Sequence, residues 1–153
     1  MQDEPFIPVA FDPPRTLIDD QFVLEPLGPQ HNERDYAAWT SSMPQIRTTP
    51  GFDQSSWPHE MTLDENRGDL ERHAQDFETR SGFTFTVLDP ADGDVIGCLY
   101  IYPRRDGPGA RVRSWVRADR AALDVPLAER VAAWLVDWPF EHVRYEGRPA
   151  LSR

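Results

Sequence analysis

Side chains that could donate or accept a proton in catalysis lie at two places in this chain. His59 and Glu60 are adjacent at the end of an irregular segment, and an imidazole beside a carboxylate suits general acid–base catalysis. Tyr100 and Tyr102 lie two residues apart in an apolar run and share one face of a predicted strand. His59, Glu60 and Tyr100 are therefore the candidate catalytic residues. The alternative is that the first pair is solvated surface and the tyrosines pack against a helix.

Side chains that could bind an anion lie further along the chain. Arg113, Arg117 and Arg120 occur where a predicted strand passes through a polar turn into a helix. Arginine forks and the free amides of a helix N-terminus both bind phosphate. Equally, these arginines face solvent or pair with Asp119 and Glu129.

Other chemistries find little support in the sequence. Cys98 lies inside an apolar strand, which favours a buried core residue over a nucleophile. His31, His73 and His142 have no partner at metal-ligand spacing, so no metal cofactor is expected. The glycine patterns of serine hydrolases, nucleotide hydrolases and dinucleotide-binding enzymes are absent.

Composition indicates one folded domain in a chain of 153 residues. We expect a Pro/Asp-rich arm over residues 1–20 and a single domain over 21–153. The net charge of −10 argues against nucleic-acid binding. Residues 1–103 hold 6 arginines and 19 acidic residues, whereas residues 104–153 hold 10 arginines and 7 acidic residues. This asymmetry predicts that an anionic ligand binds the last third and a cationic ligand the rest, unless it only reflects a codon preference for arginine.

The chain gives no sign of export or of membrane insertion. Its first residues are acidic and lack the apolar segment of a signal peptide, and no apolar run reaches the roughly 20 residues of a membrane span. The single cysteine excludes an internal disulfide and fits a reducing compartment. A cytoplasmic location without membrane contact is expected.

Hydrophobic periodicity predicts the elements that would position these side chains. We expect a strand over 22–27, a short helix capped by Asn32 and Asp35, and a long loop over 44–59. A capping box at Thr62–Glu65 begins a helix that ends near Gly82. Strands are expected over 83–87 with one exposed face, over 95–102 at the centre of the sheet, and over 111–117. A helix over 126–138 and a strand over 142–146 complete the order β-α-α-β-β-β-α-β.

This order resembles that of the GCN5-related N-acetyltransferase (GNAT) superfamily. FTFTVLDPADGDVIGCLYIYP is similar to the second and third strands of that family, and RVRSWVRADRAALDVPLAERVAAWL to its fourth strand, cofactor loop and third helix. The resemblance implies an α/β (α+β) fold with a mixed, mostly antiparallel sheet flanked by helices. It also implies acetyl-CoA as the co-substrate, with its pyrophosphate on the turn and its pantetheine between two splayed strands. The residues that match those cofactor-binding positions are Ser114, Trp115, Val116, Arg117, Arg120, Leu123, Asp124 and Val125.

Two departures from the family pattern stand out. The family turn usually reads Arg/Gln-x-x-Gly-x-Gly/Ala, whereas Leu123 and Val125 occupy the small positions here, and Asp124 is suited to capping the helix. The chain also looks abbreviated after its last predicted helix, where the family supplies a tyrosine that protonates the leaving thiolate. A partner chain would then complete the site, or the site is lost.

The function expected from these features is acetyl transfer from acetyl-CoA to a small amine, which the acidic first two thirds favour as a cation. The alternative is a non-catalytic domain of the same architecture that binds a ligand or a second copy of itself. Trp134 and Trp138 could form the surface of such a homodimer, although a helical stripe of this kind also suits the core.

Overall fold

The computed structural model of the protein describes residues 5–148 and 151–152. The first four residues of the expected arm lie outside this part. The described chain forms a sheet of seven strands in the order of the sequence, in which every neighbouring pair is antiparallel except β5–β6. The strands are β1 (Leu17–Ile18), β2 (Val23–Pro26), β3 (Phe83–Leu88), β4 (Val95–Pro103), β5 (Ala110–Val116), β6 (His142–Tyr145) and β7 (Leu151–Ser152).

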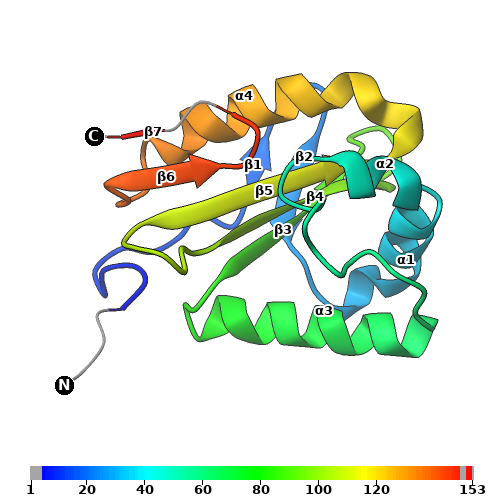
Figure 1. The fold of residues 1–153 in the computed structure, drawn as a ribbon, viewed down its shortest axis with the longest axis horizontal. Helices are drawn as coiled ribbons and strands as arrows, with labels where there is room; N and C mark the ends of the chain where they lie inside the picture. Colours follow the sequence, from blue (N-terminus) through cyan, green and yellow to red (C-terminus); the bar gives the residue numbers. More distant parts are fainter. Residues whose placement is uncertain (1–4, 149–150, 153) are drawn as a thin grey trace.

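Helices cover both faces of this sheet, and Figure 1 shows α4 along one side and α3 along the other. The four α-helices are α1 (Asn32–Thr40), α2 (Met43–Thr48), α3 (Leu63–Glu78) and α4 (Asp124–Leu135), and two short 3-10 helices are η1 (Pro29–His31) and η2 (Ala118–Leu123). The helix α4 supplies the crossover that the parallel pair β5–β6 requires. The element order expected from the sequence is therefore confirmed, with α2, β1 and β7 as additions.

Two hydrophobic clusters lie on opposite faces of the sheet. The first packs α4 and the N-terminal segment against the strands, and it buries Trp134, Trp138 and Ile7 with Phe6 and Phe11 beside them. These two tryptophans are thus core residues. The second cluster packs α1, α2 and α3 on the other face; its buried members are Leu27, Ala38, Trp39, Ile46, Phe52, Leu70, Leu88, Val95, Cys98, Tyr100 and Trp115.

The expectation that β3 exposes one face is wrong. Thr84 is 1% exposed and Thr86 is 0% exposed, although both are polar residues of the alternating pattern. The reason is tertiary, since α3 covers the face on which the threonines lie. The hydroxyl of Thr84 lies 2.9 Å from His73 Nδ1, whereas Thr86 Oγ1 has no hydrogen-bond partner within the described chain.

These two threonines give a matched test of buried polarity. Thr86→Val is expected to raise the free energy of unfolding by about 1 kcal/mol, because it replaces an unsatisfied buried hydroxyl by a methyl group of similar size. Thr84→Val is expected to lower it by about 1 kcal/mol, because the hydroxyl that meets His73 is lost. Urea unfolding of both variants measures the difference, and equal effects of the two substitutions would contradict it.

The long loop expected over 44–59 begins later than predicted. Residues Met43–Thr48 form α2, with Pro44 in its first turn, where proline is compatible with a helix. The segment 49–62 is the irregular part. The capping prediction for α1 is also wrong: His31 holds the N-cap position, and Asp35 is a buried residue inside the helix.

The remaining elements agree closely with expectation. The capping box that begins α3 is present, with Thr62 Oγ1 accepting from the Glu65 amide at 3.0 Å and Glu65 Oε1 accepting from the Thr62 amide at 2.9 Å. The central position of β4 and the strand β6 are confirmed.

The last helix begins at Asp124 and ends at Leu135, and no side chain caps its N-terminus, so the expected capping role of Asp124 is wrong.

Candidate active site

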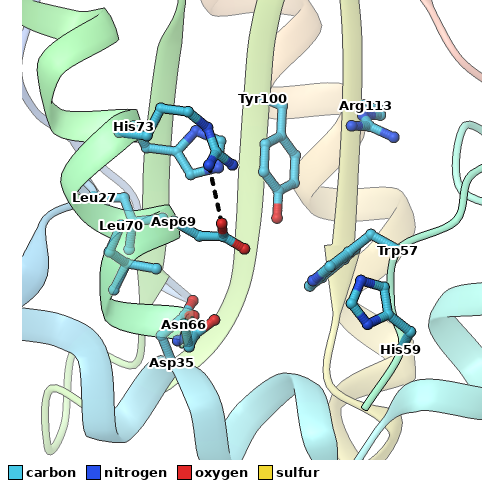
Figure 2. A pocket seen from close by; sticks show the side chains of 11 residues that line it. Leu27, Asp35, Trp57, His59, Asn66, Asp69, Leu70, His73, Tyr100 and Arg113 are labelled. Atoms are coloured by element: carbon cyan, nitrogen blue, oxygen red, sulfur yellow. Dashed lines mark hydrogen bonds and ion pairs between the residues drawn. The ribbon is translucent and has the colours of Figure 1, made fainter. Parts of the chain in front are cut away.

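A pocket of about 320 Å³ lies on the sheet face that α1 and α3 cover. Figure 2 shows Tyr100 projecting into it from β4, with Asp69 of α3 on one side and Trp57 on the other. The residues that line it are Leu27, Asp35, Trp57, His59, Asn66, Asp69, Leu70, Arg72, His73, Tyr100 and Arg113.

The pairing of β4 with β5 sets the floor of this pocket. Tyr100 lies opposite Arg113 and Cys98 lies opposite Trp115, so these side chains share one face. Trp115 Nε1 donates to the Tyr100 hydroxyl at 3.0 Å. Burial raises the pKa of Tyr100 well above its usual value, so the phenol stays protonated at neutral pH and can donate a hydrogen bond.

The segment 49–62 forms the opposite wall. The Trp57 ring lies 5.4 Å from that of Trp39 and 6.2 Å from that of Trp115, and this packing holds the segment over the sheet. His59 lines the pocket, and its Nδ1 lies 2.9 Å from the backbone oxygen of Glu60. The structure thus brings His59 and Tyr100 to one pocket, whereas Glu60 is exposed and is not among the lining residues.

A carboxyl group that the sequence did not single out lies at one end of the pocket. Asp35 is 4% exposed, and its Oδ2 accepts a hydrogen bond from Asn66 Nδ2 at 3.1 Å. Asn66 is itself oriented by Trp39 Nε1, which donates to its Oδ1 at 3.0 Å. Burial raises the pKa of Asp35 to about 6, which outweighs the opposing effect of the Asn66 hydrogen bond. A carboxyl group that titrates near neutrality can accept a proton from a substrate.

His73 belongs to a hydrogen-bond network between α3 and the sheet. Its Nδ1 lies 2.9 Å from both the Tyr102 and the Thr84 hydroxyls, and Tyr102 donates to Asp76 Oδ2 at 2.8 Å. Burial, with a smaller contribution from Arg72, lowers the pKa of His73 to about 4. The imidazole is therefore neutral at pH 7 and serves to connect the helix to β3 and β4.

This network predicts a pH effect on stability. The folded chain holds the His73 proton less tightly than the unfolded chain does, so its contribution to the unfolding free energy grows as pH rises from about 4 to 6.5. His73→Gln cannot titrate and is expected to reduce that rise by up to about 3 kcal/mol. Urea unfolding at several pH values measures this, with the exposed His142→Gln as control. A wild-type pH dependence in His73→Gln would contradict the prediction.

The cofactor positions expected on β5 lie where this strand parts from β6. The parallel pairing ends at Val112 and Tyr145, beyond which β5 continues to Val116. Because the Arg117 amide donates to Ile96 on β4, alternation directs the backbone groups of Ser114 and Val116 away from β4. Gln45 Nε2 donates to the Val116 carbonyl at 2.9 Å.

A tyrosine of β6 forms a side-chain hydrogen bond with β5. The Tyr145 hydroxyl lies 2.6 Å from Ser114 Oγ, and both side chains are buried. Burial raises the pKa of Tyr145 to about 12, so it carries its proton at neutral pH. From the sequence, Tyr145 was given no role, and no aligned counterpart of the family's tyrosine was found after the last helix.

The expected phosphate-binding turn is a 3-10 helix, and its arginines already have partners. Arg117 pairs with Asp94 at 2.8 Å and with Asp119 at 2.7 Å, and Arg120 pairs with Asp89 at 2.8 Å. The pairing of Arg117 with Asp119 is the alternative that the sequence left open. These contacts leave less free positive charge at the turn than the arginine count suggests.

The last three cofactor positions differ in their surroundings. Leu123 is half-buried against the first core cluster, and Val125 is 55% exposed. Asp124 Oδ2 accepts from Arg148 Nη2 at 2.6 Å instead of capping α4.

From the sequence, Asp35 was interpreted as a capping residue, and no role was assigned to the pocket residues Asn66, Asp69 and Arg72. Asp35 precedes the buried Trp39 by four residues, which places its carboxyl group on the apolar face of α1, and that spacing was the available signal.

No group of three or more His, Cys, Asp or Glu side chains within residues 5–148 is arranged to hold a metal ion. None of the described helices is long and apolar enough to cross a membrane.

Comparison with protein-family models gives no match, and comparison with curated protein sequences gives none either. Solved structures do match. A protein from Bordetella pertussis assigned to the GNAT family of acetyltransferases is 17% identical, with a TM-score of 0.59 over 85% of this chain and 77% of that one. A ribosomal-protein alanine acetyltransferase from Vibrio fischeri is 10% identical, with a TM-score of 0.59 over 85% and 72% of the two chains.

A third match is the microcin self-immunity acetyltransferase MccE, whose structure contains acetyl-CoA and AMP. It is 11% identical, with a TM-score of 0.62 over 82% of this chain and 68% of that one. At such identities the likeness defines the fold. The chain therefore has the fold of the GCN5-related N-acetyltransferases, and the expected fold class is confirmed.

Proposed function

We propose that this protein is an acetyl-CoA-dependent N-acetyltransferase that acts on the amine of a small molecule. The observation that carries this proposal is the position of β5 residues 113–116. Arg113 lines the pocket and Trp115 donates a hydrogen bond to Tyr100, while Ser114 and Val116 direct their backbone groups away from β4, beyond the last residue that β5 pairs with β6. A thioester lying along that free edge would have its carbonyl carbon next to the pocket.

The reaction requires one bond to form and one to break. The amine nitrogen attacks the thioester carbonyl carbon, the carbon–sulfur bond breaks, and the amine loses a proton. We assign the removal of this proton to Asp35, which titrates nearer to neutral pH than an ordinary aspartate. His59, which lines the same pocket, is the second candidate base.

The departing thiolate must gain a proton. We assign this step to Tyr145, whose raised pKa keeps it protonated at neutral pH and whose hydroxyl lies 2.6 Å from Ser114 Oγ on β5. Tyr100 would hold the acceptor by donating a hydrogen bond. The backbone amides of Ser114 and Val116 would polarise the thioester carbonyl.

The ion pairs of Arg117 and Arg120 beside the expected phosphate-binding turn favour the alternative function, a non-catalytic ligand-binding domain. Arg117 and Arg120 are paired with carboxylates, so a phosphate would compete with Asp119 and Asp89 for their positive charge. In this proposal the pantetheine portion of acetyl-CoA lies along β5, whereas its phosphates must compete with Asp89 and Asp119 for the arginines.

Isothermal titration with acetyl-CoA and with free CoA tests the proposal directly. We expect acetyl-CoA binding that Arg120→Glu weakens at least about tenfold, while Arg67→Glu on the exposed surface of α3 changes the same charge without effect. Release of CoA thiol in the presence of an amine then reports transfer. Absence of binding at millimolar acetyl-CoA would overturn the enzyme proposal, and binding without thiol release would favour the non-catalytic alternative.

A further inference from the structure

A second pocket of about 390 Å³ adjoins the first along the β4–β5 hairpin. The two share Arg72, His73, Tyr100 and Arg113, so they form one groove across the sheet face. The lining of the second pocket contains five arginines and one carboxylate, Asp76; the arginines are Arg72, Arg104, Arg105, Arg111 and Arg113.

Three of these arginines have carboxylate partners. Arg72 pairs with Asp69, Arg104 with Asp106, and Arg111 with Glu146; the three distances are 3.0, 3.2 and 2.9 Å. Arg105 and Arg113 form no ion pair with any described residue, so these two guanidinium groups have no carboxylate in direct contact within the described chain.

Arg113 is held in place by neutral groups. Its Nη1 donates to the Gly51 carbonyl at 2.9 Å, and its guanidinium carbon lies 4.6 Å from the centre of the Phe52 ring and 5.3 Å from that of Tyr100. These contacts fix the guanidinium where the two pockets meet, and they leave donors free because a guanidinium has five N–H groups. A fixed, partly desolvated guanidinium is well suited to pair with carboxylate or phosphate oxygens.

We propose that the acceptor carries an oxyanion group, a carboxylate or a phosphate, that binds Arg113 and Arg105 while its amine lies toward Asp35. This inference rests on the proposed function and names its substrate class. It reverses the expectation of a cationic acceptor, because the acidic residues that give the first two thirds their charge do not line this groove in excess. Pockets of this size hold a small molecule or a few peptide residues.

The negative charge of the whole protein makes the proposal specific. A chain with a net charge of −10 repels anions at long range, so binding of an anion must come from the local arginines. A diamine, in contrast, would be attracted by the whole protein and repelled only within the groove.

Four amines of similar size test this: 4-aminobutyrate, phosphoethanolamine, butylamine and 1,4-diaminobutane. Isothermal titration without acetyl-CoA is expected to give at least about tenfold tighter binding of one of the two anionic amines than of the diamine. The carboxylate and the phosphate compounds identify which oxyanion is preferred. Equal or tighter binding of the diamine would overturn the proposal.

Variants locate the site. Arg113→Gln is expected to weaken binding of the anionic amine at least about tenfold, with partial recovery in Arg113→Lys, and Arg67→Gln is the matched control. Arg105 is exposed, so Arg105→Gln keeps the fold and is expected to weaken binding about threefold even if Arg113→Gln does not fold. Unchanged binding in Arg105→Gln and in a folded Arg113→Gln would overturn the assignment. If the wild-type protein binds the anionic amine through Arg113 but does not bind acetyl-CoA, the anion site is supported and only the proposed acetyl transfer is contradicted.

Discussion

Asp35→Asn is expected to lower kcat/KM for acetyl transfer by about 10²- to 10⁴-fold, the usual contribution of a general base. Asparagine has nearly the same size and keeps an oxygen that can accept from Asn66 Nδ2, so the hydrogen bond of 3.1 Å can persist. What the variant loses is the capacity to accept a proton. Release of CoA thiol measures the rate, and circular dichroism establishes that the variant is folded.

The pH profile separates this role from a structural one. Wild-type kcat/KM is expected to rise with pH up to about 6, the pKa of Asp35, and then to level off, because the ionised form removes the proton. Asp35→Asn is expected to lack that limb, and Asp64→Asn on the exposed surface of α3 is expected to keep it. If His59→Gln abolishes the limb and Asp35→Asn retains it, the base is His59.

Ionisation of Asp35 also affects the free energy of unfolding. The folded chain holds the Asp35 proton more tightly than the unfolded chain, since its pKa rises from 3.8 to about 6. Its contribution to the unfolding free energy therefore falls as pH rises through that window, by up to about 3 kcal/mol. Asp35→Asn is expected to remove this fall. His73 acts in the opposite direction over nearly the same window, so the two variants must be compared separately with the wild type.

The sequence predicted elements whose signals are local. The capping box at Thr62 and Glu65 involves residues three apart, and the apolar run of β4 indicates a central strand by itself. Burial of Thr84 and Thr86 could not be predicted in this way. Their exposure depends on the packing of α3 across β3. A local sequence pattern does not predict which helix covers which face of the sheet.

The candidate site was predicted only in part for a related reason. Tyr100 was identified because its strand is evident from the sequence. That Arg113 lies beside Tyr100 could not be predicted, because it depends on the register of β4 with β5. Asp35 was interpreted as a capping residue, although the helix begins three residues before it. Pairing of Arg117 and Arg120 with Asp94 and Asp89 required knowledge of contacts more than 20 positions apart in the chain.

Gly97→Ala is expected to lower the free energy of unfolding by about 3 kcal/mol, the upper end of the usual cost of overpacking a core. Gly97 lies in the central strand opposite Val116, and a Cβ atom there would lie 2.5 Å from the Trp115 carbonyl oxygen. The obstruction is backbone, so β4 and β5 must separate to accommodate the methyl group. That shift would also move the backbone edge at Val116 on which the thioester is proposed to lie.

Gly68→Ala is the matched control for this substitution. Gly68 is exposed within α3, and nothing lies within 4 Å of the position its Cβ would take. Alanine is the better helix former, so Gly68→Ala is expected to raise the unfolding free energy by about 1 kcal/mol. Urea unfolding and titration with acetyl-CoA measure the two variants side by side. An unfolding free energy of Gly97→Ala within about 1 kcal/mol of the wild-type value would mean that the two strands separate at little cost, and the close approach at Gly97 would then not define the geometry of the cofactor edge.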